Sequence, residues 1–166
     1  MTSREKILQA IGRTTDASQS AGLLSWDPGV GPTDLIDFYK AAVSRAGGEC
    51  VDGAAAEPRS FIHERFPHAQ VVVSLDPRFN GNMDIQSVPT PHDLKTVDVA
   101  IIPTSLAVAE NAAHLLDESI VHRVLPFIAQ HLVLLLRREH IVATMHEAYR
   151  NIQPGSIGFG VFVAGP

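Results

Sequence analysis

Two unbroken apolar runs limit the kind of fold that this chain can form. The run AQVVVSL covers residues 69–75, and VDVAIIPT, residues 97–104, is almost as continuously apolar. Runs of this length without alternating polar positions are typical of strands that are buried on both faces. Such strands occur in parallel sheets that are covered by helices. The sequence therefore predicts an α/β protein, with parallel strand pairing through crossover connections.

Further helices and strands are predicted around these two runs. Apolar residues at helical spacing from residue 33 predict a helix that Gly47 and Gly48 end, and Pro58 fits the first turn of a second helix. The stretch 106–116 is either two short strands or a helix. The other predicted elements are a strand over 49–53, a short helix over 118–127, a strand over 131–136, an amphipathic helix over 139–152 and a glycine-rich strand over 156–166. Together they predict a three-layer, Rossmann-like parallel sheet with helices on both faces.

The chain divides into two parts by composition. Residues 1–32 are predicted as an N-terminal helix followed by an extended arm rich in Ser, Thr, Gly and Pro, and residues 33–166 form the α/β domain. Trp26 is a large apolar group in the arm, and it would pin the arm to the body or to a second subunit. The sequence therefore leaves open whether the chain forms a homo-oligomer.

Charge and cysteine content exclude several classes of function. The net charge is −5, and no basic cluster exceeds the pair Arg137-Arg138, so no nucleic-acid partner is expected. The chain shows no apolar signal segment and no run long enough for a membrane span, which predicts a cytoplasmic protein. The single cysteine, Cys50, excludes an all-cysteine iron–sulfur or zinc site and is expected to be a small buried residue.

Two residues are candidates for chemistry at the rim of the predicted sheet. Glu110 ends an almost purely apolar stretch, so it suits acid–base work or ligand binding; alternatively, it caps a backbone turn or pairs with Arg123. His131 begins a strand, where it is either a hydrogen-bonded structural residue or a proton donor and acceptor. The eight histidines do not form a recognisable metal motif. Glu110 and His114 are four residues apart, and their side chains would point to the same side only if this stretch were a helix. No metal site is predicted.

Several short motifs follow one another in the C-terminal half, roughly residues 97–166. In order they are Ala109-Glu110, Leu125-Pro126, His131, Ile141-Val142 and Gly165-Pro166. With these motifs the segment resembles the LUD domain family, that is, lactate-utilisation protein C (LutC/YkgG). The resemblance implies a fold like that of the NagB/RpiA/CoA-transferase superfamily. It also implies a LutC-like subunit of a complex that oxidises L-lactate to pyruvate. In such a complex the iron–sulfur clusters are expected on partner proteins, with no cofactor bound by this chain.

In that interpretation Glu110 and His131 are the catalytic candidates, and they should converge on one cavity. The candidates for binding the small organic acid are Asn80, Asn82, Asn111 and Gly165.

Two departures from the family leave the enzymatic role open. The family's Glu-Thr-Gly-Thr is Glu110-Asn111-Ala112-Ala113 here, so a glycine and two hydroxyls are missing, and the chain stops where the family continues. These departures favour a non-catalytic assembly module. A third hypothesis is an isomerase or CoA-transferase-like enzyme acting on an anionic substrate, which the glycine-rich residues 158–160 would support.

Overall fold

The computed structural model describes residues 4, 32–53, 58–117, 120, 122–152 and 158–165. The predicted N-terminal helix and arm, including Trp26, lie outside the described residues, apart from residues 4 and 32. The described strands form one sheet in the order β1-β2-β5 and a second in the order β6-β3-β4-β7. Within the described ranges, no helix has the length and apolar character needed to span a membrane.

The two apolar runs form neighbouring strands of a parallel sheet, the first at its edge and the second at its centre. β1 (Val72–Ser74), β2 (Val99–Pro103) and β5 (His131–Leu135) pair in parallel, with β2 in the middle. The first four residues of β2 are buried, as expected for a strand with helices and sheet neighbours on every side. The predicted α/β class and the parallel pairing of these strands are confirmed.

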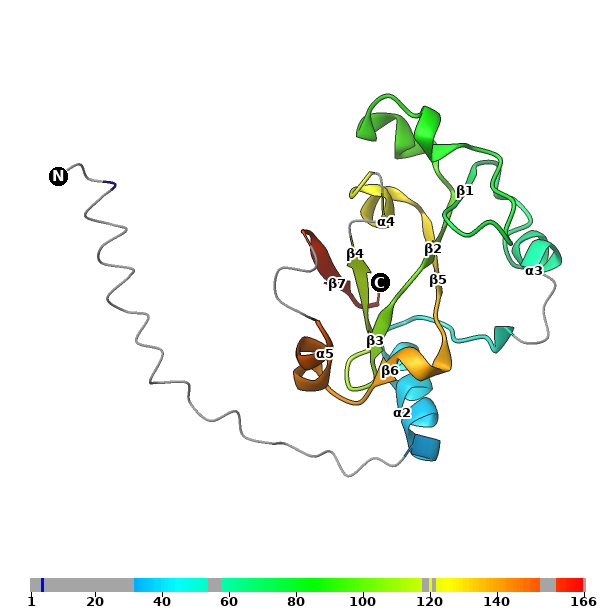
Figure 1. Cartoon of the computed structure of the whole chain (residues 1–166). Helices are drawn as coiled ribbons and strands as arrows, with labels where there is room; N and C mark the ends of the chain where they lie inside the picture. Colours follow the sequence, from blue (N-terminus) through cyan, green and yellow to red (C-terminus); the bar gives the residue numbers. More distant parts are fainter. Residues whose placement is uncertain are drawn as a thin grey trace.

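The second sheet contains antiparallel pairs as well. It is built from β3 (Leu106–Val108), β4 (Ala113–Asp117), β6 (Ile141–Val142) and β7 (Gly160–Val163). β3 pairs in parallel with β6 but antiparallel with β4, and β4 pairs antiparallel with β7. The turn at residues 109–112 is too short for a crossover, so the chain returns as a hairpin. The stretch 106–116 is thus two strands. β3 continues the path of β2 (Figure 1).

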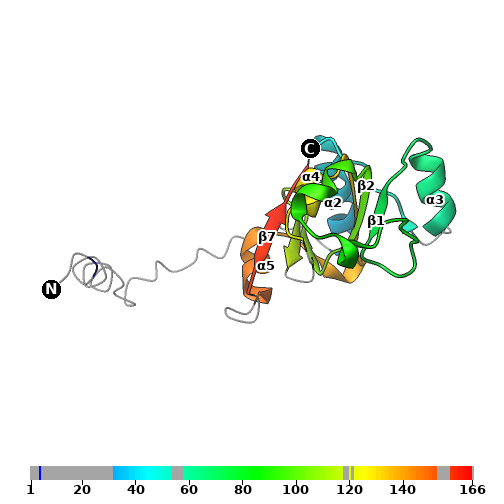
Figure 2. The same cartoon turned by 90° about the horizontal axis from the view of Figure 1, so that it is seen from above.

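Within the described residues, four α-helices and three 3₁₀ helices surround the strands. They are α2 (Pro32–Arg45), α3 (Pro58–Arg65), α4 (Leu125–Ile128), α5 (Met145–Asn151), η3 (Ile85–Ser87), η4 (Pro91–Thr96) and η5 (Arg138–His140). α3 and α5 lie on opposite sides of the body in both views (Figures 1 and 2). α2 and α3 agree with the predicted helices.

Alternate residues of β3 show how the layers are arranged. Ala107 packs in a cluster with Tyr39 of α2, whereas Val108 packs in another cluster with Ala148 of α5. Because successive side chains of a strand point to opposite faces, α2 and α5 cover opposite faces of β3. The predicted three-layer arrangement follows from this alternation.

Two local predictions are wrong. The helix expected over 139–152 begins only at Met145, because Ile141 and Val142 pair with β3 as strand β6. Residues 49–53 form no strand, and Cys50 is exposed instead of buried. This segment is fixed by side-chain contacts of its acidic residues, which a local pattern of apolar residues does not reveal.

Candidate functional site

Glu110 lies in the turn after β3 and contributes to the cap of α5. Its Oε1 accepts a hydrogen bond of 2.9 Å from the backbone N–H of Met145, the first residue of that helix. Thr144 is the N-cap residue of the same helix. Arg123 stacks over the ring of Phe159 at 4.3 Å. Of the alternatives set out for Glu110, the geometry therefore shows the capping of a neighbouring backbone.

His131 lies at the amino-terminal edge of the parallel sheet. It pairs with Val99, its N–H donates to the carbonyl of Asp98 at 2.8 Å, and its exposed ring packs against Phe66 at 4.9 Å. Glu110, in contrast, follows β3. β3 begins only after the carboxyl end of β2, which is the end opposite to the one where His131 lies. The structure therefore does not bring Glu110 and His131 together, and their catalytic roles stay predictions.

Each of the three asparagines proposed for substrate binding has a different local environment. Asn82 holds the edge of β1, since its Oδ1 accepts from the N–H of Val72 at 2.8 Å and its Nδ2 donates to the carbonyl of Gln70. Asn111 is exposed and accepts from the N–H of residue 113 at 3.1 Å, which shapes the β3–β4 turn. Asn80 is exposed. Their substrate contacts stay predictions.

A cleft of about 1630 Å³ opens along β5 and at the carboxyl ends of β1 and β2. Its walls come from α2, from residues 46–53 and from residues 65–69. His131 and Gly165 line it, whereas Glu110 and the three asparagines do not. Gly165 has a φ of +48°, and a Cβ there would lie 2.6 Å from the Cβ of Ala46, so close packing against α2 requires glycine.

A buried polar network forms part of the floor of this cleft. His114 of β4 shares a hydrogen bond of 2.8 Å between its Nε2 and the hydroxyl of Tyr39, and its Nδ1 lies 3.4 Å from the hydroxyl of Thr104. All three side chains line the cleft and are less than a tenth exposed. Burial lowers the pKa of His114 to about 4, so the ring is neutral at pH 7, and burial also raises the pKa of the Tyr39 hydroxyl. The network can therefore accept or donate hydrogen bonds without carrying a charge.

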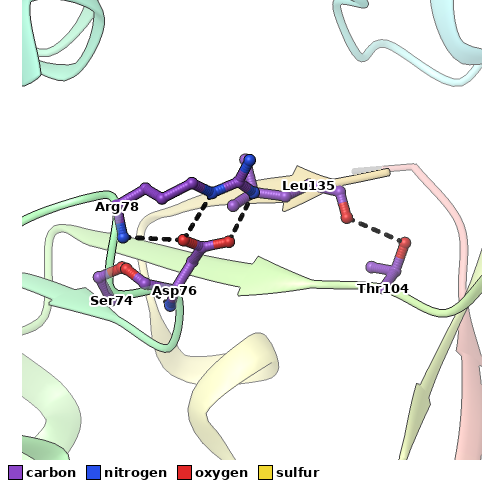
Figure 3. A network of polar contacts seen from close by, with 5 residues as sticks. All are labelled: Ser74, Asp76, Arg78, Thr104 and Leu135. Carbon is purple, nitrogen blue, oxygen red and sulfur yellow. Dashed lines mark hydrogen bonds and ion pairs between the residues drawn. The ribbon is translucent and has the colours of Figure 1, made fainter. Parts of the chain in front are cut away.

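An ion pair lies just after β1, at the carboxyl edge of the parallel sheet. Asp76 is buried, and both of its oxygens accept from the guanidinium of Arg78, at 2.9 Å and 2.7 Å (Figure 3). The hydrogen bonds from Arg78 hold the pKa of Asp76 below its usual value. Thr104 follows β2 and bonds to the carbonyl of Leu135 at the end of β5 (Figure 3). Polar side chains thus follow β1 and β2, at the edge where open α/β sheets place ligands.

Two further cations reach the cleft from other elements. Lys40 of α2 lies 3.0 Å from a carboxylate oxygen of Asp52, and Arg138 of η5 lies 2.7 Å from the other oxygen. Their hydrogen bonds, with that of Lys40 the larger cause, lower the pKa of Asp52. Five cationic side chains line the cleft in all, together with four carboxylates, which leaves an excess of one positive charge for an anionic ligand. The cations are Lys40, Arg65, Arg78, Arg137 and Arg138, and the carboxylates are those of Glu49, Asp52, Asp76 and Asp98.

Apart from His131 and Gly165, the residues of this cleft were not among the sequence candidates, although one signal pointed to some of them. Asp76 directly follows the first apolar run, Thr104 is the polar last residue of the second, and His114 interrupts an otherwise apolar strand. Tyr39 carries no such signal, because helical spacing marks it only as a core residue. In the part of the chain that the structure describes, no three His, Cys, Asp or Glu side chains gather closely enough to hold a metal ion.

The comparisons with known proteins reveal a similarity in fold. No family model matches the chain, and no curated protein matches it. Among solved structures, it is similar to the crystal structure of a DUF162 family protein from Deinococcus radiodurans, with a TM-score of 0.63 and 18% sequence identity. The likeness covers 81% of this chain and 89% of that chain. The α/β architecture described above is therefore shared with a DUF162 family protein.

Proposed function

We propose that this chain binds a small organic acid in the cleft and acts as a LutC-like component of a complex that oxidises L-lactate to pyruvate. The binding site is inferred from the buried network of Tyr39, His114 and Thr104, which lies at the edge of the parallel sheet where α/β proteins bind ligands. The resemblance of residues 97–166 to the LUD domain supplies the substrate, and the fold shared with a DUF162 family protein is compatible with that resemblance.

The network is suited to the hydroxyl or keto oxygen of such an acid. If the Tyr39 hydroxyl donates to Nε2 of His114, its oxygen is free to accept from a ligand hydroxyl. With the other imidazole tautomer, the Tyr39 hydroxyl is free to donate to a ligand carbonyl. A neutral His114 supports both arrangements, so one site can hold both the hydroxy acid and the keto acid of the reaction.

In this proposal, the electrons released by the oxidation pass to partner proteins. The chain has one cysteine, too few for a cysteine-ligated iron–sulfur cluster. The proposal therefore places the clusters on partner subunits and gives this chain the task of holding the acid.

Ligand-induced thermal shifts test the proposal. L-lactate, pyruvate and propionate are compared on wild type, Tyr39→Phe and Tyr149→Phe, the last an exposed tyrosine on α5 outside the cleft. A ligand at a hundred times its dissociation constant stabilises by about 2.7 kcal/mol, or several degrees in Tm. Wild type and Tyr149→Phe should prefer lactate and pyruvate to propionate, which lacks the second oxygen.

Tyr39→Phe should lose that preference while it keeps its affinity for propionate, because it loses only the hydroxyl. The proposal is wrong if none of the three acids shifts the Tm of wild type.

An assembly module of the same complex is the second candidate function. The engagement of Glu110 in the cap of α5 favours it, because that carboxylate is already used for structure. The exposed rings of Phe127 and Tyr149 also favour it, since exposed aromatic side chains are common anchors of protein interfaces. A chain that binds no acid but assembles stably with iron–sulfur partner proteins would support this candidate.

A further inference from the structure

Two cations from separate elements meet on a single carboxylate at the wall of the cleft. Lys40 Nζ lies 3.0 Å from Oδ2 of Asp52, and Arg138 Nη2 lies 2.7 Å from Oδ1. Each cation therefore takes a different oxygen of the same group. All three residues line the cleft.

The place of these cations in the fold points to ligand binding. Lys40 directly follows Tyr39 in α2, and Arg138 follows β5 at the carboxyl edge of the parallel sheet. Asp52, in contrast, belongs to residues 48–53, which form neither a strand nor an α-helix. Two cations held this close repel each other unless an anion lies between them. The pair is thus arranged as a receptor for one carboxylate.

We infer that Lys40 and Arg138 form the binding clamp for the carboxylate of a small organic acid, and that Asp52 is an internal competitor for this clamp. The identity of the acid rests on the function proposed above, whereas the clamp itself does not. The competitor is easily displaced: the side chains of Lys40, Asp52 and Arg138 are 35%, 53% and 66% exposed, and ion pairs this exposed are weak.

Cys50 provides a local reporter of what occupies the clamp. It is the single cysteine of the chain, it is exposed, and it lies two residues before Asp52. Burial raises the pKa of the Cys50 thiol; Lys40 lowers it, and Asp52 raises it again. Because the thiolate is the reactive form, removal of the Asp52 charge should speed alkylation by neutral iodoacetamide. A bound carboxylate should slow it again.

The experiment measures L-lactate affinity and Cys50 alkylation on five versions of the full chain: wild type, Asp52→Asn, Glu49→Gln, Lys40→Met and Lys95→Met. Asp52→Asn should bind lactate about threefold to tenfold more tightly, the gain from removing two exposed ion pairs. Lactate should also slow alkylation in this variant. Glu49→Gln removes a carboxylate from the same segment without touching the clamp, and it should behave as wild type. Lys40→Met should weaken binding, whereas exposed Lys95→Met, outside the cleft, should not.

The outcomes separate the clamp from the proposed function. If lactate binds to wild type but Asp52→Asn binds it no more tightly and Cys50 is unaffected, the clamp is refuted and the proposed function stands. If lactate binds to no version, acetate and inorganic phosphate are tested on Asp52→Asn. Protection of Cys50 by either anion, lost when Lys40→Met is added, would support the clamp and refute the lactate site. No protection by any anion would refute both.

Discussion

Acidification should destabilise the protein through His114. The ring has an ordinary pKa of 6.5 and a pKa of about 4 in the folded chain, where burial disfavours its charged form. Between these two values the unfolded chain binds the proton more readily than the folded chain. The contribution to stability is therefore complete above pH 6.5 and is lost as the pH falls from 6.5 to 4. A difference of 6.5 − 4 in pKa corresponds to about 3 kcal/mol.

Urea unfolding at pH 7, 5.5 and 4.5 measures this loss. Wild type should lose most of the expected free energy over that range, and so should the control His146→Gln, which replaces an exposed histidine of α5. His114→Gln should start from a lower stability and lose less. The lowered carboxyl pKa values of Asp52, Asp76 and Asp98 place their own losses at more acid pH.

An NMR titration of the wild-type imidazole rings gives a readout that does not depend on any variant. One ring should titrate near pH 4. A midpoint near 6.5 for His114, or an unchanged pH dependence in His114→Gln, would refute the reasoning.

Two substitutions test the backbone, one beside β1 and one in the β3–β4 turn. Gly81→Ala would place a Cβ 2.7 Å from the carbonyl oxygen of Val72, so unfolding should become easier by about 1–3 kcal/mol; an unchanged urea midpoint would show that the backbone gives way freely. Ala112 has a φ of 56°, which costs a non-glycine residue about 1 kcal/mol or more, so Ala112→Gly should stabilise the chain by up to about 0.5–1 kcal/mol. Ala109→Gly, in the same turn without a positive φ, should destabilise it, and a gain in both variants would contradict the reasoning.

The expected glycine of the β3–β4 turn shows how far local sequence reaches. The LUD domain family, which residues 97–166 resemble, has a glycine where this chain has Ala112, and the backbone there has the positive φ that glycine favours. The turn of this chain thus has a conformation that favours glycine, although the residue there is an alanine. Asn111 replaces a family hydroxyl residue and bonds to the turn's own backbone, which the sequence comparison alone does not reveal.

The local sequence was sufficient for the elements that bury whole segments. The runs around β1 and β2 specify parallel strands, and β2 is buried on both faces as predicted, whereas β1 at the edge of the sheet is only partly buried. Helix α2 follows from the spacing of its apolar residues and from the glycines that end it. The same reasoning failed at residues 49–53, where ion pairs with distant residues, and no strand pairing, hold the chain.

The cleft was decided only by the tertiary structure. Tyr39 and His114 are 75 residues apart, and they meet because α2 covers the face of the sheet toward which His114 points. Glu110 was singled out by its lone charge, yet its partner is the backbone of a helix that begins 35 residues later. Apolar periodicity is a property of one segment, so the sequence displays it directly. The meeting of polar groups depends on which strands become neighbours and in what register, and only the packed chain establishes that.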